Sequence, residues 1–372
     1  MSALTRFKPQ FTAGQQRYLI NNNYTLQNYL KCDGSVLAQS TYPELYQSIG
    51  LIPSGLNSWI QRSSGTTSQI NTLVHNAVDT YVYAGSGGVL RTSTDTVTWT
   101  TRTSGTINAI NSLLYANGLF VYGANSGVLS TSTDGITWTA RTTGTTQAIA
   151  SLGYGNGLYI FGGNSGVLST STDGITWTAR TSNTTGIIGT ITYINGIYFY
   201  GASNGNLRTS TDGITWTVRT SGTTISIRSI VYGNGLYLYT GSGRALGTST
   251  DGITWTPQYN LAASTISFMS TIYDNGLFIS VPGTAGTKNI YTSTDGINWY
   301  DRPLLNNNGT MLSIIKGISD NTYLSSNTSG QLFYANRYSY NSTTEFILPK
   351  SNNLFSASQI YVYNPTAYIK AK

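Results

Sequence analysis

The chain has 372 residues and a net charge of +7, but only 9% of its residues are charged and 39% are hydrophobic. Its one cysteine, Cys32, excludes an intrachain disulfide and a cysteine-based zinc site, and its one histidine, His75, excludes a metal cluster of several histidines. The basic residues form no run and no apolar stretch reaches a membrane-spanning length, so we expect no nucleic-acid partner and no membrane insertion. We also expect no cofactor, and the absence of an apolar signal core near Met1 predicts no export through a cleaved signal.

The first fifty residues differ in character from the rest of the chain. Residues 1–31 are polar and are predicted to form an N-terminal arm or attachment segment. Residues 32–50 begin with an Asp33-Gly34 turn signal, and Pro43 suits the first turn of a helix that Gly50 ends. This stretch therefore predicts a turn followed by one short helix.

One seven-residue sequence recurs through most of the chain. Ser132-Thr-Asp-Gly-Ile-Thr-Trp138 appears four times unchanged and twice as a close variant, with its aspartates spaced by 39 residues four times and then by 44. A fixed period in this range is typical of repeat architectures. The aspartates of the six copies are Asp95, Asp134, Asp173, Asp212, Asp251 and Asp295.

One repeat reads as four strands joined by tight turns. In the third unit we expect strands over 148–154, 158–161, 167–170 and 175–180. Asn156-Gly157 is a strong hairpin signal because both turn positions tolerate a positive φ. Four antiparallel strands in about 39 residues, with no helix signal, describe a blade of a β-propeller.

The tryptophans give the number of blades. The chain has seven tryptophans. Six end the copies of the heptapeptide, and Trp59 precedes the first complete unit, whereas the last unit contains none. We therefore expect residues 51–343 to form an all-β, seven-bladed β-propeller with four-stranded blades, closed by pairing of the Trp59 strand with the last blade. The seven are Trp59, Trp99, Trp138, Trp177, Trp216, Trp255 and Trp299.

The segments on either side of the repeats resemble the phage tail-collar family. The resemblance lies in Cys32-Asp-Gly-Ser35, the Tyr-Pro-Glu-Leu-Tyr stretch that follows, Thr344-Glu-Phe-Ile-Leu-Pro349 and the ending Tyr368-Ile-Lys370. It implies a small collar-like α+β domain formed by residues 32–50 and 344–372, into which the propeller is inserted. Insertion requires that the two ends of the guest lie close together, and a closed ring meets this condition.

The repeated heptapeptide resembles the Asp-box of sialidases and, in its length, that of propellers related to a photosystem II assembly factor. We expect a structural role, in which the aspartate accepts backbone N–H groups and the tryptophan packs between blades. A sialidase-type site also needs a glutamate, but Glu44 and Glu345 both lie outside the repeats. We therefore expect no enzymatic activity and no metal.

An arginine stands three residues after most of the tryptophans. These side chains form a basic ring that could hold an anionic partner, or they are ordinary solvated residues of the outer strands. The positions are Arg62, Arg102, Arg141, Arg180, Arg219 and Arg302, with Gln258 in the remaining place.

The loops of a meander fall on two faces, and length varies mainly on the face opposite the heptapeptide. Because binding residues concentrate on loops carried by a rigid scaffold, this face is the predicted receptor-binding face. The candidate residues are Tyr259, Asn260, Lys288, Asn306, Asn307 and Asn308.

The resemblances together suggest a phage tail fibre or tail-tip protein, located in the virion tail after assembly in the host cytoplasm. Its expected partners are other virion tail proteins and a host surface receptor, with a polysaccharide as the candidate, and tail fibres suggest a homotrimer. The alternatives are a structural spacer or decoration protein, a cellular assembly factor and, last, a sialidase-like glycosidase.

Overall fold

The structure is a computed structural model that describes residues 16–18, 29–31, 36–38, 59–258, 267–284, 289–303, 307–319, 322–336, 345–347 and 367–370. The chain divides into two compact units, one of residues 58–336 and one that combines residues 1–57 with 337–372. Among the described residues, no helix is long and apolar enough to cross a membrane.

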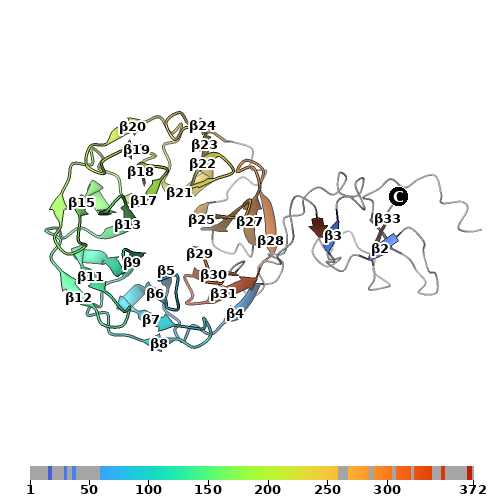
Figure 1. The fold of residues 1–372 in the computed structure, drawn as a ribbon, viewed down its shortest axis with the longest axis horizontal. Helices are drawn as coiled ribbons and strands as arrows, with labels where there is room; N and C mark the ends of the chain where they lie inside the picture. Colours follow the sequence, from blue (N-terminus) through green and yellow to red (C-terminus); the bar gives the residue numbers. More distant parts are fainter. Residues whose placement is uncertain are drawn as a thin grey trace, which may run out of the picture. The chain divides into compact units, whose positions relative to one another are not determined.

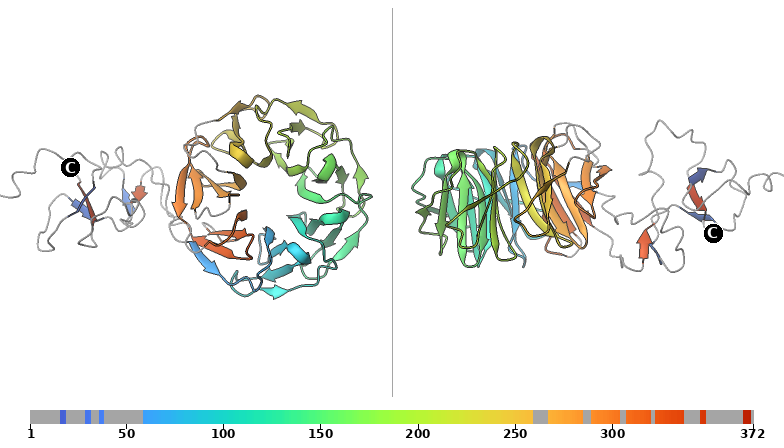
Figure 2. Two further views of the ribbon diagram at one scale, coloured as in Figure 1. Left: turned by 180° about the vertical axis from the view of Figure 1, so that it is seen from behind. Right: turned by 90° about the horizontal axis from the view of Figure 1, so that it is seen from above.

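The larger unit is a ring of seven four-stranded antiparallel sheets (Figures 1 and 2). The predicted all-β, seven-bladed propeller with four-stranded blades is thus confirmed. In each blade the first strand lies nearest the axis and the fourth lies at the rim, as Figure 1 shows for β9 to β12.

The strands of the first four blades follow the chain without interruption. Blade 1 contains β5 (Ile70–His75), β6 (Tyr81–Gly85), β7 (Leu90–Ser93) and β8 (Thr100–Thr101). Blade 2 contains β9 (Ile110–Ala116), β10 (Leu119–Ala124), β11 (Leu129–Ser132) and β12 (Thr139–Arg141). Blade 3 contains β13 (Ile149–Gly155), β14 (Leu158–Gly163), β15 (Leu168–Ser171) and β16 (Thr178–Ala179). Blade 4 contains β17 (Ile188–Ile194), β18 (Ile197–Ala202), β19 (Leu207–Ser210) and β20 (Thr217–Arg219).

The last three blades complete the ring. Blade 5 contains β21 (Ile227–Gly233), β22 (Leu236–Gly241), β23 (Leu246–Ser249) and β24 (Thr256–Pro257). Blade 6 contains β25 (Phe268–Asp274), β26 (Leu277–Pro282), β27 (Asn289–Ser293) and β28 (Tyr300–Pro303). Blade 7 contains β29 (Met311–Lys316), β30 (Thr322–Asn327), β31 (Leu332–Asn336) and β4 (Trp59–Arg62). Short 3-10 turns join the second and third strands of four blades: η2 (Ser86–Gly88), η3 (Asn125–Gly127), η4 (Asn164–Gly166) and η5 (Ser242–Arg244).

Ring closure uses a strand from the beginning of the repeat region. β4 pairs with β31 in the register Trp59↔Ala335 to Arg62↔Leu332. The seventh sheet thereby joins residues 270 to 276 positions apart in the chain. Such pairing removes an exposed sheet edge and ties the two ends of the ring together.

The turns divide the ring into two faces. The hairpins between the first and second strands and the heptapeptide turns lie on one face, which we call the box face. The 3-10 turns and the connections between blades lie on the other, the crossover face. The chain enters β4 and leaves β31 at the box-face end of blade 7.

The core of the ring lies between neighbouring blades. One cluster joins Val82 and Leu90 of blade 1 to Ile110 and Phe120 of blade 2, with Trp138 packed against it. The first residue of each inner strand is fully buried, as in Ile149 and Ile188. Burial of one such side chain contributes roughly 1.5–3 kcal/mol, so the repeated apolar positions supply most of the ring's stability.

The outer strands begin later than the sequence predicts. In blade 3 the fourth strand is β16 at Thr178, not at Ile175. The backbone N–H groups of Ile175 and Thr176 donate to the Asp173 carboxylate. They are therefore unavailable to the strand ladder, and the outer strand starts only after Trp177.

The smaller unit pairs segments from both ends of the chain. β1 (Gln16–Tyr18) and β2 (Tyr29–Lys31) flank β33 (Ala367–Lys370) in one sheet. β3 (Val36–Ala38) pairs with β32 (Glu345–Ile347) in another. The helix expected before Gly50 lies outside the described residues. The division into an arm (1–31), a collar-like domain (32–50 with 344–372) and a propeller (51–343) stays a prediction.

Ring closure predicts a stability difference between two shortened chains. A chain beginning at Ser58 keeps β4, whereas one beginning at Ser63 leaves blade 7 with three strands and an exposed edge. We expect the second chain to unfold at a clearly lower temperature in calorimetry, because it loses both the strand pairing and buried Trp59. Equal melting temperatures would show that β4 does not close the ring.

Candidate functional site

The heptapeptide turn is organised by one carboxylate oxygen. In blade 3, Oδ1 of Asp173 accepts the N–H groups of Ile175 and Thr176, both at 2.8 Å. The Ser171 hydroxyl donates to the same oxygen at 2.8 Å and accepts the N–H of Gly174 at 2.9 Å. The same arrangement recurs in the other five complete copies, at Asp95, Asp134, Asp212, Asp251 and Asp295.

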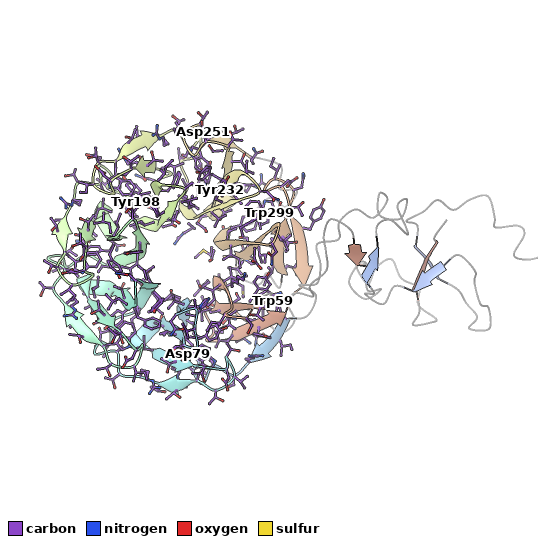
Figure 3. The ribbon with its side chains drawn as sticks, in the orientation of Figure 1. Trp59, Asp79, Tyr198, Tyr232, Asp251 and Trp299 are labelled. Atoms are coloured by element: carbon purple, nitrogen blue, oxygen red, sulfur yellow. The ribbon has the colours of Figure 1, made fainter. Side chains whose placement is uncertain are left out.

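These bonds stabilise the ionised form of the aspartates. The N–H groups of Thr176 and Ile175, together with the Ser171 hydroxyl, lower the pKa of Asp173 from 3.8 to about 2. The equivalent hydrogen bonds lower the pKa of Asp95 and of Asp251 to about 2. The carboxylates lie on the rim, where Figure 3 labels Asp251. An aspartate fixed in this way shapes a turn and is a poor proton donor at neutral pH.

The tryptophan that ends each turn packs against an aromatic ring of its own blade. The ring centroids of Tyr200 and Trp216 are 4.8 Å apart, and those of Phe161 and Trp177 are equally close. Blade 6 carries Ser280 at the position of Tyr200, and Phe268 on the inner strand replaces the missing ring, 4.8 Å from Trp299. The sequence pattern gave no sign of this exchange.

Four of the recurrent arginines, those of blades 1 to 4, use one nitrogen for the same structural bond, whereas Arg62 of blade 7 bonds to Thr96 and lies over the ring of Tyr334. Nε of Arg180 donates to the Thr170 hydroxyl at 2.9 Å, and Arg102, Arg141 and Arg219 repeat the bond. Gln258 donates to Thr248 from its amide at the same distance. A neutral side chain thus makes the same contact in blade 5. The hydrogen bond, and not the charge, is the feature that the repeat retains, which favours the solvated structural interpretation over the basic ring.

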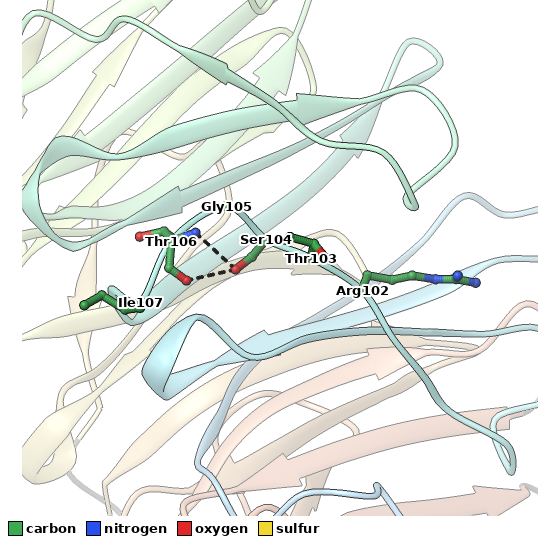
Figure 4. Close-up of a pocket in the computed structure, with 6 residues that line it drawn as sticks. All are labelled: Arg102, Thr103, Ser104, Gly105, Thr106 and Ile107. Carbon is green, nitrogen blue, oxygen red and sulfur yellow. Dashed lines mark hydrogen bonds between the residues drawn. The ribbon is translucent and has the colours of Figure 1, made fainter.

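The connections between blades are tied down on the crossover face. The Ser182 hydroxyl donates to the carbonyl of Gly166 in the adjoining 3-10 turn at 2.6 Å, and Tyr200 donates to the carbonyl of Ser182 at 2.5 Å. A shallow pocket of about 580 Å³ on this face is lined by the connection 102–107 (Figure 4). Ile107 in this connection is 89% exposed. The connections on the crossover face are therefore held by internal hydrogen bonds, and they expose apolar as well as hydroxyl side chains to solvent.

Four of the six candidate receptor residues lie outside the described residues: Tyr259, Asn260, Lys288 and Asn306. The side chain of Asn307 is only 4% exposed and accepts bonds from Gly309 and Asn327, so it supports its own loop. Asn308 is exposed, and its backbone N–H donates to the side chain of Gln331. Their role in binding stays a prediction.

Near the end of the inner strand, where blades 2 to 6 carry a tyrosine such as Tyr115, blade 7 has Lys316, which makes a polar contact. Lys316 forms an ion pair with Asp274 at 3.0 Å, and the Tyr323 hydroxyl donates to the other carboxylate oxygen at 2.7 Å. Nε2 of His75 lies 2.9 Å from the carbonyl oxygen of Lys316, and burial lowers the pKa of this histidine. The contacts join blades 6, 7 and 1. Among the described residues, no three groups of the metal-binding kind lie together.

Sequence reasoning missed two arginines of blade 5. Arg228 lies on the inner strand and Arg244 in the 3-10 turn η5, so both lie on the crossover face. Their signal in the sequence is a departure from the repeat. The aligned positions in the first four blades carry no charged residue.

Solved structures match about three quarters of the chain. No protein-family model and no curated protein matches the chain. The solved structure titled "YCF48 bound to D1 peptide" matches with a TM-score of 0.62 and 16% identity, over 76% of this chain and 95% of that one. YCF48 from Cyanidioschyzon merolae matches with a TM-score of 0.60 and 18% identity, over 75% of this chain and 99% of that one. The WD40 repeats of RRP9 match with a TM-score of 0.62 and 8% identity, over 77% of this chain and 100% of that one.

At these identities the likeness concerns the fold. It agrees with the seven-bladed ring and shows structural similarity to YCF48, a photosystem II assembly factor.

The carboxylate of Asp173 predicts a graded response to substitution. Asp173→Ala removes the acceptor of two backbone N–H groups, so we expect the free energy of unfolding to fall by about 1 kcal/mol, as for a lost helix cap. Asp173→Asn keeps an acceptor oxygen and should lose less. Denaturant unfolding at pH 7 measures both, and equal losses for the two variants would argue against the proposed bonding.

The lowered pKa values predict acid sensitivity in a defined window. Because the folded pKa of Asp95, Asp173 and Asp251 is about 2, below the ordinary 3.8, their contribution is complete above about pH 4 and declines as the pH falls to 2. The melting temperature should decline across this range. Asp173→Asn should show a shallower decline than the wild type, and parallel curves would contradict the assignment.

The arginine bond predicts that charge can be removed without loss of stability. Arg180→Gln should keep the bond to Thr170, as Gln258 does to Thr248, and leave the melting temperature unchanged. Arg180→Ala should lower it. A loss with glutamine equal to that with alanine would indicate that the charge itself is required.

Proposed function

We propose that the chain is a non-catalytic recognition protein of a phage tail fibre or tail tip, and that the crossover face binds a receptor on the host surface. The pairing of β3 with β32 carries this proposal. It joins the two segments that resemble the tail-collar family, Val36–Ala38 and Glu345–Ile347, although the whole ring separates them in sequence. This pairing supports an arrangement in which a small domain anchors the ring to other tail proteins.

The geometry of the ring supports recognition by the crossover face. The chain enters and leaves at the box-face end of blade 7, so the crossover face is the one free of chain ends. Its loops are fixed by internal bonds and rich in hydroxyl groups, which suit a glycan. Against enzymatic activity, the six box aspartates are occupied by backbone N–H groups.

A second candidate rests on the solved structures. YCF48 has been solved with a D1 peptide. By analogy, the ring would hold a peptide of another protein during assembly, in a cell and not on a virion. Binding to an unfolded peptide segment in place of a host surface would favour this candidate, and a ring with neither activity would favour a structural spacer.

Two exposed isoleucines allow a matched test of the binding face. Ile107 lies on the crossover face and is 89% exposed, whereas Ile175 lies on the box face and is 43% exposed. Labelled full-length protein should bind host cells and compete with phage adsorption. Ile107→Glu should weaken both effects, and Ile175→Glu should leave them intact. A folded protein that neither binds cells nor competes would contradict the receptor function.

A further inference from the structure

Arg244 holds a backbone conformation that the other blades give to glycine. It ends η5 with a φ of +72°. The aligned residues of blades 1 to 4 are Gly88, Gly127, Gly166 and Gly205, each at a φ between 69° and 74°. A residue with a Cβ is strained in this region, and such strain is concentrated at functional sites. An arginine at this position therefore lowers the stability of the turn, which suggests that its side chain has a function.

Arg228 departs from the repeat in the same blade. It is the second residue of β21, where the pairing with β22 shifts register between Ile227 and Ser229. The aligned residues are Asn71, Asn111, Ala150 and Gly189. The arginine is solvent-accessible, but the protein around it removes part of its hydration and lowers its pKa. Beside it, a Cβ added to Gly189 would meet only the Ile227 carbonyl, at 3.7 Å, so there is open space.

The two arginines lie on adjoining elements of blade 5, Arg228 on the inner strand β21 and Arg244 in the η5 turn that follows β22. Ile227 pairs with Gly241, and the N–H of Ser242 donates to the carbonyl of Ser226 at 3.0 Å. Adjacent strands are about 4.8 Å apart, so an arginine side chain on β21 is long enough to reach the η5 turn. In blade 2 the residue aligned with Arg228, Asn111, donates from its amide at 3.0 Å to Asn125, which is aligned with Ser242, the first residue of η5.

Neither arginine has an acidic partner among the described residues. The described aspartate side chains lie at the box-face ends of their strands or in box-face turns, away from η5: Asp79, Asp95, Asp134, Asp173, Asp212, Asp251, Asp274 and Asp295. Nε of Arg244 is buried and makes no hydrogen bond within the described part of the chain. A buried donor without an acceptor costs free energy that a bound anion would offset.

We propose that Arg228 and Arg244 form an anion site on the crossover face, which takes the carboxylate or sulfate group of an acidic saccharide. This proposal deepens the receptor function and rests on it. Repeat duplication does not account for the pair, because both residues are exceptions to the repeat. Each guanidinium group can donate two parallel hydrogen bonds to a carboxylate or sulfate group, and the space beside Gly189 is open.

The surroundings favour a saccharide over other polyanions. Hydroxyl groups and backbone border the site, including Ser242, Ser226 and Ser267, whose hydroxyl accepts the N–H of Gly243 at 2.9 Å. A nucleic acid requires a row of cations along its phosphates or aromatic side chains for its bases. Two isolated arginines among hydroxyl groups suit instead one charged sugar within a mostly neutral chain.

Binding of defined polysaccharides to the full-length protein tests the site. Dextran sulfate and polygalacturonate are the anionic probes and dextran is the neutral control, measured by calorimetry. Arg228→Gln should weaken anionic binding about tenfold, as expected for one lost charge-assisted hydrogen bond. Arg244→Gly should weaken it similarly and also raise the melting temperature, because glycine relieves the strained φ. A purely structural arginine would instead lose stability when replaced.

Arg180→Gln is the matched control, because it removes one charge and keeps its structural bond. Arg180→Gln should bind the anionic polysaccharides as tightly as the wild type does. If it loses as much affinity as Arg228→Gln, the effect comes from net charge alone, and the proposed site is wrong. Wild-type binding by Arg228→Gln and Arg244→Gly would also overturn it, as would tighter binding of polyglutamate than of either saccharide. If Arg228→Gln still binds host cells fully, the receptor function stands and the anion site falls. If the protein binds the anionic saccharides but does not bind host cells, the anion site stands and the receptor function falls.

Discussion

Each complete blade depends on a turn in which one aspartate oxygen receives two backbone N–H groups and a serine hydroxyl. This bonding fixes the chain between the third and fourth strands and places a tryptophan against the core between blades. Without it the short outer strands, some of only two residues, have little to hold them. The ring is therefore assembled from repeated local turns, and its closure requires only that β4 supply the strand that blade 7 lacks.

Much of this could be predicted because repetition averages out local ambiguity. One Asn-Gly pair or one tryptophan is a weak signal, but recurrence at 39 residues determines strand order, blade size and the number of blades. The boundaries of the outer strands were harder to predict. Ile175 and Thr176 look like strand residues, but their N–H groups are bound to Asp173. A side-chain acceptor therefore overrides a pattern of β-branched residues.

The candidate site was less predictable, because its residues depend on contacts between positions distant in sequence. That Phe268 replaces an aromatic ring lost at Ser280, or that Gln258 repeats an arginine's bond, follows only from three-dimensional packing. Loop length predicted a binding role for Asn307, but its side chain is buried within its own loop. The more informative signal was an exception to the repeat: Arg244 at a position where four blades have glycine. In a duplicated chain, conserved copies describe the scaffold and deviations indicate what has been added to it.

The central claim is that the repeated turns build the scaffold while departures from the repeat carry recognition. Replacing all six box aspartates by asparagine in one full-length chain tests it most directly. The claim predicts a lower melting temperature, because six charge-assisted turns are weakened, with unchanged binding to host cells and to anionic polysaccharide well below that temperature. A variant that stays folded with an unchanged melting temperature but loses binding would contradict the claim and make the aspartates themselves the recognition site.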